Sequence, residues 1–355
     1  MNENYANFTY CPIDVHSHET GPFFYINQFN HCTTFITVPL AMFLKVMAAR
    51  SDYAERFKLI TLNNTGRCGS TLLTQLFENS VQGTVSISEP EILVCMVQAK
   101  KKPGSFATEN RTALLKASIN ILCMSATRRP GYENTTCVII KPKAHAIAIP
   151  WELGEIFPDM KQIYMFRHPV DYVNSLQTVF ISLLHPIARS KLIQRSVGYD
   201  MAGFILTHFD DTENDPYNIA TKIVTHFDLD HYPYRFACLY VANMLGIRYQ
   251  RTEKHVDFKV VSYHELVAKP KTTMRGVFEF CGLPDVSVEN ISENDSQKNS
   301  GLSRQTLTKF KKSLSEAEIE EVDKVLKMSG FPDQKSFPLD AETLTQTLLT
   351  ARQTV

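Results

Sequence analysis

Short β-rich runs of apolar residues alternate along the chain with stretches that have helical spacing. Residues 57–62 (FKLITL) are one such run, and in residues 70–80 (STLLTQLFENS) the apolar side chains recur at the interval of a helix face. Ser70 and Thr71 stand where they can cap that helix. The pattern over residues 57–80 therefore predicts strand, loop and helix.

Three further segments show strand character. Residues 163–166 (IYMF) precede a helical stretch, residues 84–88 (TVSIS) lead to Glu89, and residues 137–140 (CVII) lead to Lys141. Pro169 stands where it can open the helix that follows the IYMF strand. Each of these strands therefore ends close to residues whose side chains could bind a ligand or take part in catalysis.

The apolar run at residues 32–49 (CTTFITVPLAMFLKVMAA) is divided by Pro39 and interrupted by Lys45. It falls short of the ~20 residues that a membrane-spanning helix needs. We interpret Pro39 onward as the first turn of a buried amphipathic helix, with a membrane element as the alternative. The chain is expected to have no stable membrane span.

The length of 355 residues and the hydrophobic content of 44% favour one large domain with appendages. We expect an N-terminal extension over residues 1–50, packed on an α/β domain that covers residues 51–340, and a C-terminal tail at residues 341–355. The sequence does not indicate an oligomeric state.

Charge and cysteine usage narrow the class of partner. The 37 Lys and Arg residues balance the 37 Asp and Glu residues, so no global field attracts a polyanion, and nucleic acid is not an expected partner. Any anion site must be local. The eight cysteines form no CxxC pair, which favours reduced thiols and a cytoplasmic location over a Golgi or secretory one.

The loop between residues 62 and 70 has the composition of a phosphate cradle. Gly66 and Gly69 let backbone N–H groups converge on an anion, and the following helix N-terminus adds partial positive charge. An ordinary glycine turn that caps a helix is the alternative. The loop of nucleoside triphosphate enzymes ends in Gly-Lys-Ser/Thr, whereas no lysine follows Gly69 here, so kinase or ATPase chemistry is disfavoured.

A second candidate anion site follows the strand at residues 163–166. Arg167 comes directly after that strand, and Ser175 lies eight residues later, about two turns into the expected helix. An arginine fork and a hydroxyl group are suited to a terminal phosphate monoester.

Together the two segments resemble the sulfotransferases that use 3′-phosphoadenosine 5′-phosphosulfate (PAPS). In that family an RxGST loop wraps the 5′-phosphosulfate, and a strand ending R-x-P, with a serine eight residues on, holds the 3′-phosphate. The stretches RCGSTLL and FRHPVDYVNS match both motifs in the same order. The resemblance implies that Arg167 and Ser175 contact the 3′-phosphate, and it places the following residues around the 5′-phosphosulfate: Gly66, Arg67, Cys68, Gly69, Ser70 and Thr71.

Two later stretches support the resemblance, which then covers residues 57–330. Residues 258–284 are similar to the family's late strand, its Y-E-D-L turn and the helix after it, with Tyr263 as a donor contact and His264 where an acid is usual. Residues 302–326 are similar to its C-terminal helices. In the segment NSGLSR, Arg304 is a candidate for the family's basic 3′-phosphate loop. The implied fold is a three-layer α/β sandwich, with a mainly parallel sheet in a P-loop nucleotide-binding architecture and the donor at the strands' carboxyl ends.

Candidate catalytic residues come from two strand ends. Glu89 corresponds to the "xEP" of carbohydrate-directed sulfotransferases and is a candidate base, although it could simply cap a helix opened by Pro90. The segment KPKAH is similar to the K-x-H of cytosolic members, which makes Lys141 a candidate to stabilise the leaving group and His145 a second candidate base. Their spacing of four residues leaves two possibilities: an insertion, or Lys143 in the place of the histidine.

The resemblance implies sulfuryl transfer from PAPS to a hydroxyl or amine of a small-molecule or carbohydrate acceptor, with 3′,5′-adenosine bisphosphate as product and no metal required. Residues 180–250 depart most from the family pattern and are the expected place for the acceptor pocket. The segment HFDLDH at residues 226–231 could supply metal ligands, but a linear cluster of this kind is more often a solvated loop. The alternative is a non-catalytic protein that binds a nucleotide or a partner on the same scaffold.

Overall fold

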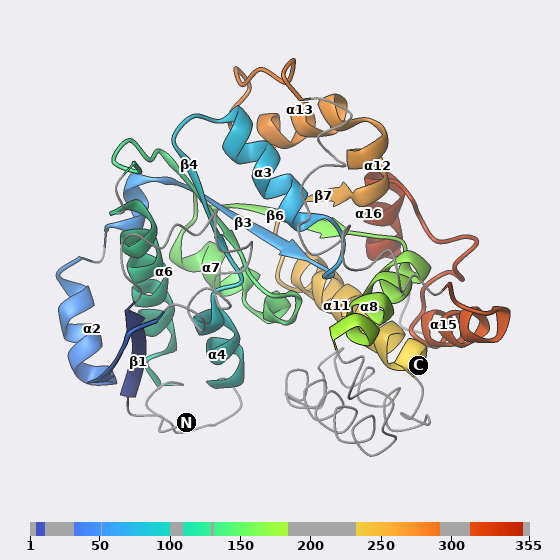
Figure 1. Cartoon of the computed structure of the whole chain (residues 1–355), viewed down its shortest axis with the longest axis horizontal. Coiled ribbons are helices and arrows are strands. Elements are labelled where there is room, and N and C mark those ends of the chain that lie inside the picture. Colours follow the sequence, from blue (N-terminus) through green and yellow to red (C-terminus); the bar gives the residue numbers. More distant parts are fainter. Residues whose placement is uncertain are drawn as a thin grey trace. The chain divides into compact units, whose positions relative to one another are not determined.

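The computed structural model describes residues 5–10, 32–50, 52–99, 109–128, 131–183, 232–291 and 313–350 (Figure 1). Its main sheet has five strands in the order β4-β5-β3-β6-β7. Their bounds are β3 Lys58–Asn64, β4 Thr84–Ser88, β5 Cys137–Lys141, β6 Lys161–Phe166 and β7 Phe258–Ser262. All five lie where the hydrophobic pattern or the family resemblance predicts a strand.

Strand pairing confirms a parallel α/β sheet. Strand β5 pairs in parallel with both β3 and β4, and Cys137 lies opposite Lys58 on one side and Thr84 on the other. The interiors of β3, β5 and β6 are buried almost continuously. Such runs are typical of strands that are covered on both faces.

Helices cover both faces of the sheet at β4. Val85 and Ile87 belong to the hydrophobic core that helix α6 (Arg111–Thr127) also lines. Between them, the backbone N–H and the hydroxyl group of Ser86 both donate to Glu78 of helix α3 (Ser70–Ser80). Because successive strand residues point to opposite faces, α6 and α3 lie on opposite sides of the strand. The expected three-layer arrangement is therefore present.

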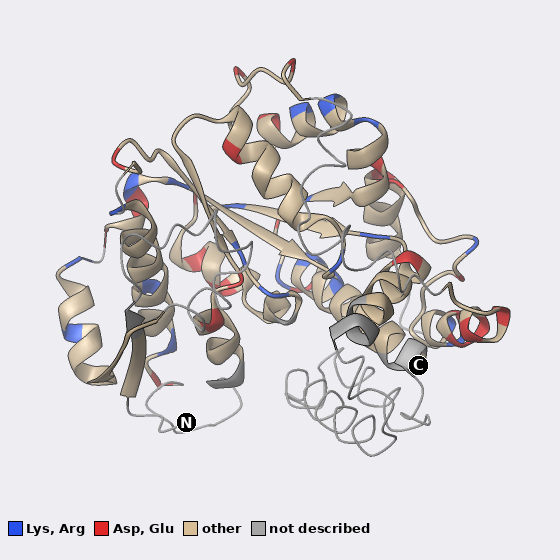
Figure 2. Ribbon diagram, in the orientation of Figure 1, with Lys and Arg blue, Asp and Glu red and all other residues tan. Residues whose placement is uncertain are grey.

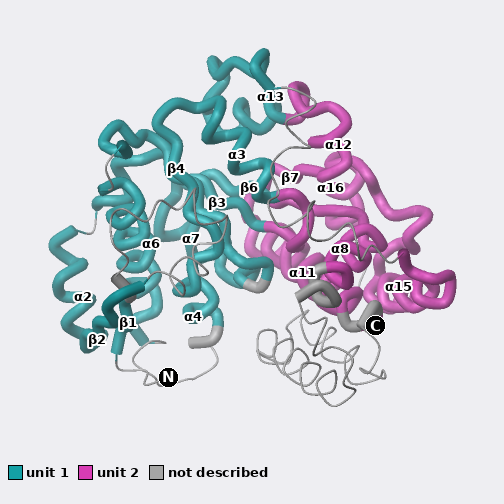
Figure 3. Tube along the Cα trace, in the orientation of Figure 1, with its two compact units in different colours: residues 1–63, 70–163, 274–292 teal, residues 64–69, 164–273, 293–355 magenta. Residues whose placement is uncertain are grey.

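The chain divides into two compact units (Figure 3). Unit 1 comprises residues 1–63, 70–163 and 274–292, and unit 2 comprises residues 64–69, 164–273 and 293–355. The boundary between the units falls within strands β3 and β6. It does not coincide with the limits at residues 50 and 340 that we expect from the sequence. The expected domain limits stay a prediction.

Unit 1 begins with an antiparallel pair, β1 (Tyr5–Tyr10) and β2 (Thr34–Pro39), followed by α2 (Leu40–Ala48). The helix begins directly after Pro39, as predicted, but it is buried on one face only. Only Phe43 and Met47 are buried, whereas the side chains at positions 42 and 46 are more than half exposed. The helix packs by a single narrow stripe because one face alone meets β1 and α6.

The remaining elements of unit 1 enclose its core. They are η1 (Ala54–Arg56), α4 (Glu91–Ala99), η2 (Ala144–Ala148), α7 (Pro150–Ile156) and most of α13 (Pro270–Phe280). Side chains from α4, α6 and α7 meet those of β4 and β5 in one hydrophobic cluster. This cluster holds the carboxyl ends of β4 and β5 in place.

Unit 2 is built around the long helix α11. Its helices are α8 (Pro169–Leu183), α11 (Tyr232–Thr252), α12 (Tyr263–Ala268), α15 (Glu316–Met328) and α16 (Ala341–Thr350). Helix α11 packs against α8, α15 and α16. Pro169 opens α8 as predicted, and α16 at the expected tail buries Leu344 and Leu348 completely.

Charged side chains of both signs are distributed over the described elements of both units (Figure 2). Among the described helices, none is long and apolar enough to cross a membrane.

Candidate anion-binding site

The loop between β3 and α3 has an unusual backbone. Gly66 and Gly69 have φ values of 80° and 84°, and Arg67 between them has a φ of 50°. Positive φ costs a glycine little, but it is uncommon for arginine and is favoured only where the surroundings hold it. Left-handed residues that alternate with residues of negative φ, as Arg67 and Gly69 do around Cys68, can turn backbone N–H groups toward one side and form a concavity for an anion.

Two N–H groups of this loop are already used within unit 2. The N–H of Thr65 donates to the Met165 carbonyl over 3.0 Å, and the N–H of Gly66 donates to Oδ1 of Asn64 over 2.9 Å. Gly66 therefore contributes its positive φ to the loop, while its N–H group already donates to Asn64. An anion would draw its hydrogen-bond donors from other groups.

Residues that are far apart in the sequence meet at Arg67. Its Nε donates to Oγ of Ser175 over 3.1 Å, and one terminal nitrogen of Arg167 donates to the Arg67 carbonyl over 3.3 Å. The Arg167 guanidinium also lies 4.5 Å from the centre of the Tyr263 ring. We call Arg67, Arg167, Ser175 and Tyr263 the arginine cluster. All four belong to unit 2.

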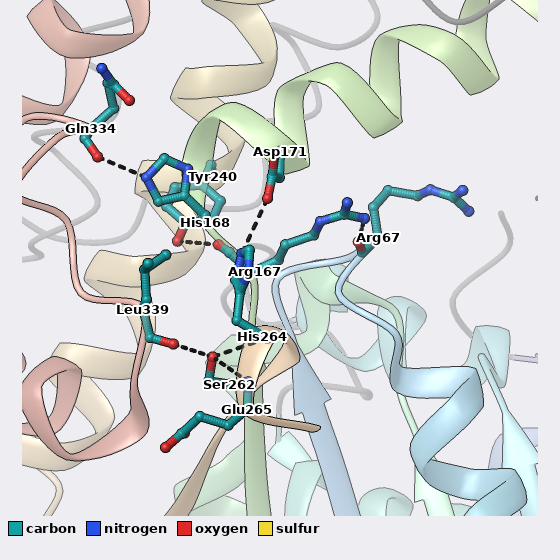
Figure 4. Close-up of polar contacts among 10 residues, drawn as sticks. All are labelled: Arg67, Arg167, His168, Asp171, Tyr240, Ser262, His264, Glu265, Gln334 and Leu339. Carbon is teal, nitrogen blue, oxygen red and sulfur yellow. Dashed lines mark hydrogen bonds and ion pairs between the residues drawn. The ribbon is translucent and has the colours of Figure 1, made fainter. Parts of the chain in front are cut away.

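Arg167 is held from several sides. Its carbonyl accepts a hydrogen bond of 2.8 Å from the hydroxyl group of the fully buried Tyr240 (Figure 4). Its Nε is buried and has no hydrogen-bond acceptor among the described residues. A buried N–H without an acceptor is costly, so this nitrogen is a natural place for an anion to bind.

Two histidines and an aspartate, His168, His264 and Asp171, lie close to Arg167 (Figure 4). Nε2 of His264 is 3.1 Å from Oδ2 of Asp171, and Nε2 of His168 lies 2.8 Å from the Gln334 carbonyl. Burial lowers the pKa of His264 below its usual value, Asp171 opposes this shift, and His168 and Arg167 add to it. A lowered pKa leaves His264 neutral at pH 7, so the two arginines supply the cationic charge of the cluster.

Gly69 packs against Tyr263 more closely than a side chain would allow. A Cβ atom at Gly69 would lie 2.6 Å from Cδ2 of Tyr263. Because the Arg167 guanidinium lies 4.5 Å from the centre of the same ring, the ring cannot move far without disturbing the cluster. Glycine at position 69 is therefore required by both φ and space.

We expect Gly69→Ala to destabilise the protein more than Gly131→Ala. Gly131 has a similar φ of 88°, but a Cβ atom there would meet nothing within 4 Å, so its substitution isolates the conformational cost, about 1–2 kcal/mol. Overpacking against Tyr263 adds about 1–3 kcal/mol at Gly69. Urea denaturation measures both, and equal losses in the free energy of unfolding would contradict the packing argument.

A second cluster lies in unit 1 at the ends of β4 and β5. The Lys141 side chain is only 1% exposed, and its Nζ donates to Oγ1 of Thr71 over 3.0 Å and lies 3.8 Å from Oε1 of Glu89. The N–H of Glu89 donates to the Lys141 carbonyl over 2.6 Å. Glu89 has a φ of 58°, a strained value of the kind that is found at functional sites. We call Lys141, Thr71 and Glu89 the lysine cluster.

The neighbouring candidates have different surroundings. Lys143 forms an ion pair with Glu91 of α4, and its side chain is 20% exposed. His145 lies in the short helix η2, but its side chain is outside the described part of the chain. Of the two lysines, Lys141 is thus the buried one. Its ammonium group contacts Thr71 in the first turn of helix α3, directly after the glycine-containing loop.

Several predicted features fall outside the described residues. These are Arg304, the HFDLDH segment and residues 184–231 of the expected acceptor region. Within the described ranges, no group of three or more His, Cys, Asp or Glu residues could hold a metal ion. Tyr240, Asp171 and Asn64 could not be found from the sequence, because no local motif marks a polar residue whose partners come from distant helices.

Each cluster has its own chemical capacity. The arginine cluster combines two guanidinium groups, a hydroxyl group and an aromatic ring, which together suit a phosphate or sulfate monoester. The lysine cluster places a buried ammonium group beside a carboxylate and a hydroxyl group, which suits the stabilisation of developing negative charge and the transfer of a proton.

No family model matches the chain, and no curated protein is similar to it. Among solved structures, a sulfotransferase domain from the curacin biosynthetic pathway is 16% identical and covers 82% of this chain and 97% of its own, with a TM-score of 0.37. A sulfotransferase from Alicyclobacillus acidocaldarius is 14% identical and covers 76% of this chain and 92% of its own, with a TM-score of 0.36. TM-scores this low do not establish a common fold.

Proposed function

We propose that this protein transfers a sulfuryl group from PAPS to a hydroxyl or amine group of a small-molecule or carbohydrate acceptor. The observation that carries the proposal is the arginine cluster. Arg67 comes from the glycine-containing loop, while Arg167 and Ser175 come from a segment about 100 residues later, and hydrogen bonds join all three. These are the residue types that the family resemblance assigns to the two ends of the donor.

The donor's phosphates have separate partners in this proposal. Arg167 and Ser175 bind the 3′-phosphate, with Arg304 as a further candidate. Arg167 is suited to this role because its buried Nε lacks an acceptor among the described residues. The loop from Arg67 to Thr71 binds the 5′-phosphosulfate, and Gly66 sets the path of that loop.

The reaction moves SO3 between two nucleophilic atoms. The acceptor oxygen or nitrogen forms a bond to sulfur as the bond between sulfur and the 5′-phosphate oxygen breaks, through a loose transition state like that of phosphoryl transfer. Negative charge grows on the departing phosphate, and Lys141 stabilises it. The acceptor's proton passes to a base, for which Glu89 and His145 are the candidates.

A non-catalytic nucleotide-binding or partner-binding protein is the second candidate function. The contact between Lys141 and Glu89 favours it in one respect, because a buried lysine paired with a carboxylate also serves as a structural ion pair. Binding of 3′,5′-adenosine bisphosphate is common to both candidates, whereas turnover of PAPS distinguishes them. A cytoplasmic location stays a prediction from cysteine usage.

Calorimetric titration with 3′,5′-adenosine bisphosphate tests the donor site. We expect micromolar binding and little binding of ATP with magnesium. Arg167→Ala should weaken the affinity roughly 10-fold to 150-fold, since a charge-assisted hydrogen bond contributes about 1.5–3 kcal/mol. Arg167→Lys should recover only part of the loss, because an ammonium group does not reproduce the fork or the stacking on Tyr263.

Arg275→Ala is the matched control, since it removes an exposed arginine on α13. Its affinity should equal that of the unsubstituted protein. If Arg167→Ala binds the bisphosphate as tightly as the control does, the assignment of the 3′-phosphate site is wrong. If the unsubstituted protein does not bind it at all, the whole proposal fails.

A further inference from the structure

A chain of hydrogen bonds within unit 2 leads from the centre of β6 to the glycine-containing loop. The hydroxyl group of Tyr164 donates to Oδ1 of Asn243 over 2.7 Å, and Nδ2 of Asn243 donates to the Asn64 carbonyl over 3.2 Å. Oδ1 of Asn64 then accepts from the N–H of Gly66 over 2.9 Å. Tyr164, Asn243 and Asn64 are all at most 5% exposed.

The chemistry of each group fixes the direction of this chain. The Asn64 carbonyl can only accept, so Asn243 must present its NH2 group to it and its oxygen to Tyr164. The Tyr164 hydroxyl group is therefore the donor to that oxygen. Burial raises the pKa of Tyr164 well above its usual value, which favours the protonated, donating form of the hydroxyl group.

Asn64 links the chain of hydrogen bonds to the glycine-containing loop, because it stands directly before that loop. Asn64 is the last residue of β3, and its side chain folds forward onto the amide two residues later. Gly66, Arg67 and Gly69 then follow with positive φ. A φ of 50° is unfavourable for Arg67, so other contacts must hold the start of the loop. Two hydrogen bonds do so: one to the backbone carbonyl of Asn64 and one from the N–H of Gly66 to the Asn64 side chain.

We propose that Asn64, Asn243 and Tyr164 are positioning residues that hold the loop in its anion-binding conformation. None of them needs to touch the donor. Asn243 fixes the carbonyl side of Asn64 from helix α11, and the Asn64 side chain fixes Gly66, so that Arg67 reaches Ser175. The proposal rests on the function proposed above for its link to donor binding, but the fixing of the loop can be measured without any ligand.

Asn64→Ala is expected to weaken the binding of 3′,5′-adenosine bisphosphate roughly tenfold, because the loop must then be ordered at the expense of binding. Tyr164→Phe, which removes the hydroxyl group that donates to Oδ1 of Asn243 but keeps the ring, should have a smaller effect in the same direction. It also serves as a second variant if Asn64→Ala does not fold. Calorimetry measures both affinities at a temperature where each variant is folded.

Asn120→Ala is a matched control for the loss of a buried asparagine. Oδ1 of Asn120 on α6 accepts a hydrogen bond of 2.8 Å from the N–H of Ala54, so the bond type and burial resemble those of Asn64. Its substitution should lower thermal stability without changing affinity for the bisphosphate. If Asn64→Ala and Tyr164→Phe bind as tightly as Asn120→Ala, these residues are structural only and the inference is wrong.

Hydrogen exchange of the unliganded protein separates this inference from the proposed function. The peptide that contains Gly66 should exchange faster in Asn64→Ala, and Asn64→Asp, which keeps an acceptor oxygen, should restore its protection. Peptides of α15 should not change. If the bisphosphate fails to bind the unsubstituted protein but exchange behaves as expected, the donor assignment falls while the positioning chain stands; unchanged exchange at Gly66 overturns the positioning chain itself.

Discussion

Replacing Lys141 with methionine is expected to slow sulfuryl transfer roughly 100-fold to 1,000-fold, the loss typical when one group that stabilises transition-state charge is removed. Methionine has a similar length and suits a buried position, and Lys141 is 1% exposed. In the proposed reaction, the ammonium group contributes most when charge develops on the departing phosphate. The turnover number should therefore fall more than the affinity for 3′,5′-adenosine bisphosphate.

The measurement is release of the bisphosphate from labelled PAPS, with an acceptor found by screening phenols, alcohols, amines and sugars. Lys143→Met is the control, and it also decides between the two lysines of the KPKAH segment. Lys143 is more exposed and pairs with Glu91, so its loss should change turnover little. If Lys143→Met is the slower variant, the assignment of the leaving-group cation must move to Lys143.

The regular elements of the site could be predicted from local signals. Helix α3 spans Ser70–Ser80 because apolar residues recur at helical spacing after a glycine-containing turn, and α8 begins at Pro169 because proline fits the first turn of a helix. The strands ending at Asn64, Lys141 and Phe166 likewise stand out as short apolar runs. Signals of this kind act within a few residues, which is why the sequence alone reveals them.

Only a resemblance could predict that Arg67 and Ser175 belong to one candidate site, and their direct contact is seen only in the structure. The two residues are 108 positions apart, and nothing in either segment specifies the other. A known pair of motifs supplies the connection that local patterns lack. Roles that the same resemblance assigns to Glu89, Lys141 and His145 stay predictions until kinetics tests them.

Other features could not be predicted, for physical reasons. Asn243 lies 179 residues from Asn64 in a helix whose sequence shows no motif, and only the folded chain shows that its amide group has two buried partners. The exposure of Met42 on α2 was missed because hydropathy records how apolar a face is, and not whether another element covers it. The charge of His264 could not be predicted from the sequence either, because it depends on the burial that lowers the pKa of this side chain.

Glu89→Gln should lower the turnover number roughly 100-fold to 10,000-fold if Glu89 is the acceptor base, which is the usual contribution of a positioned general base. Glutamine keeps the shape of the side chain, and the backbone bond from Glu89 to the Lys141 carbonyl does not depend on the carboxylate. Affinity for the bisphosphate should stay close to that of the unsubstituted protein.

Two comparisons make the Glu89 result decisive. Glu91→Gln removes a neighbouring carboxylate that is 51% exposed and pairs with Lys143, so it should leave turnover nearly unchanged. His145→Ala tests the rival base, and a large loss there with an active Glu89→Gln would transfer the role to His145. If both variants turn over PAPS at the full rate with donor binding intact, neither residue is the base, and Glu89 instead serves the start of helix α4, with Lys141 as its structural partner.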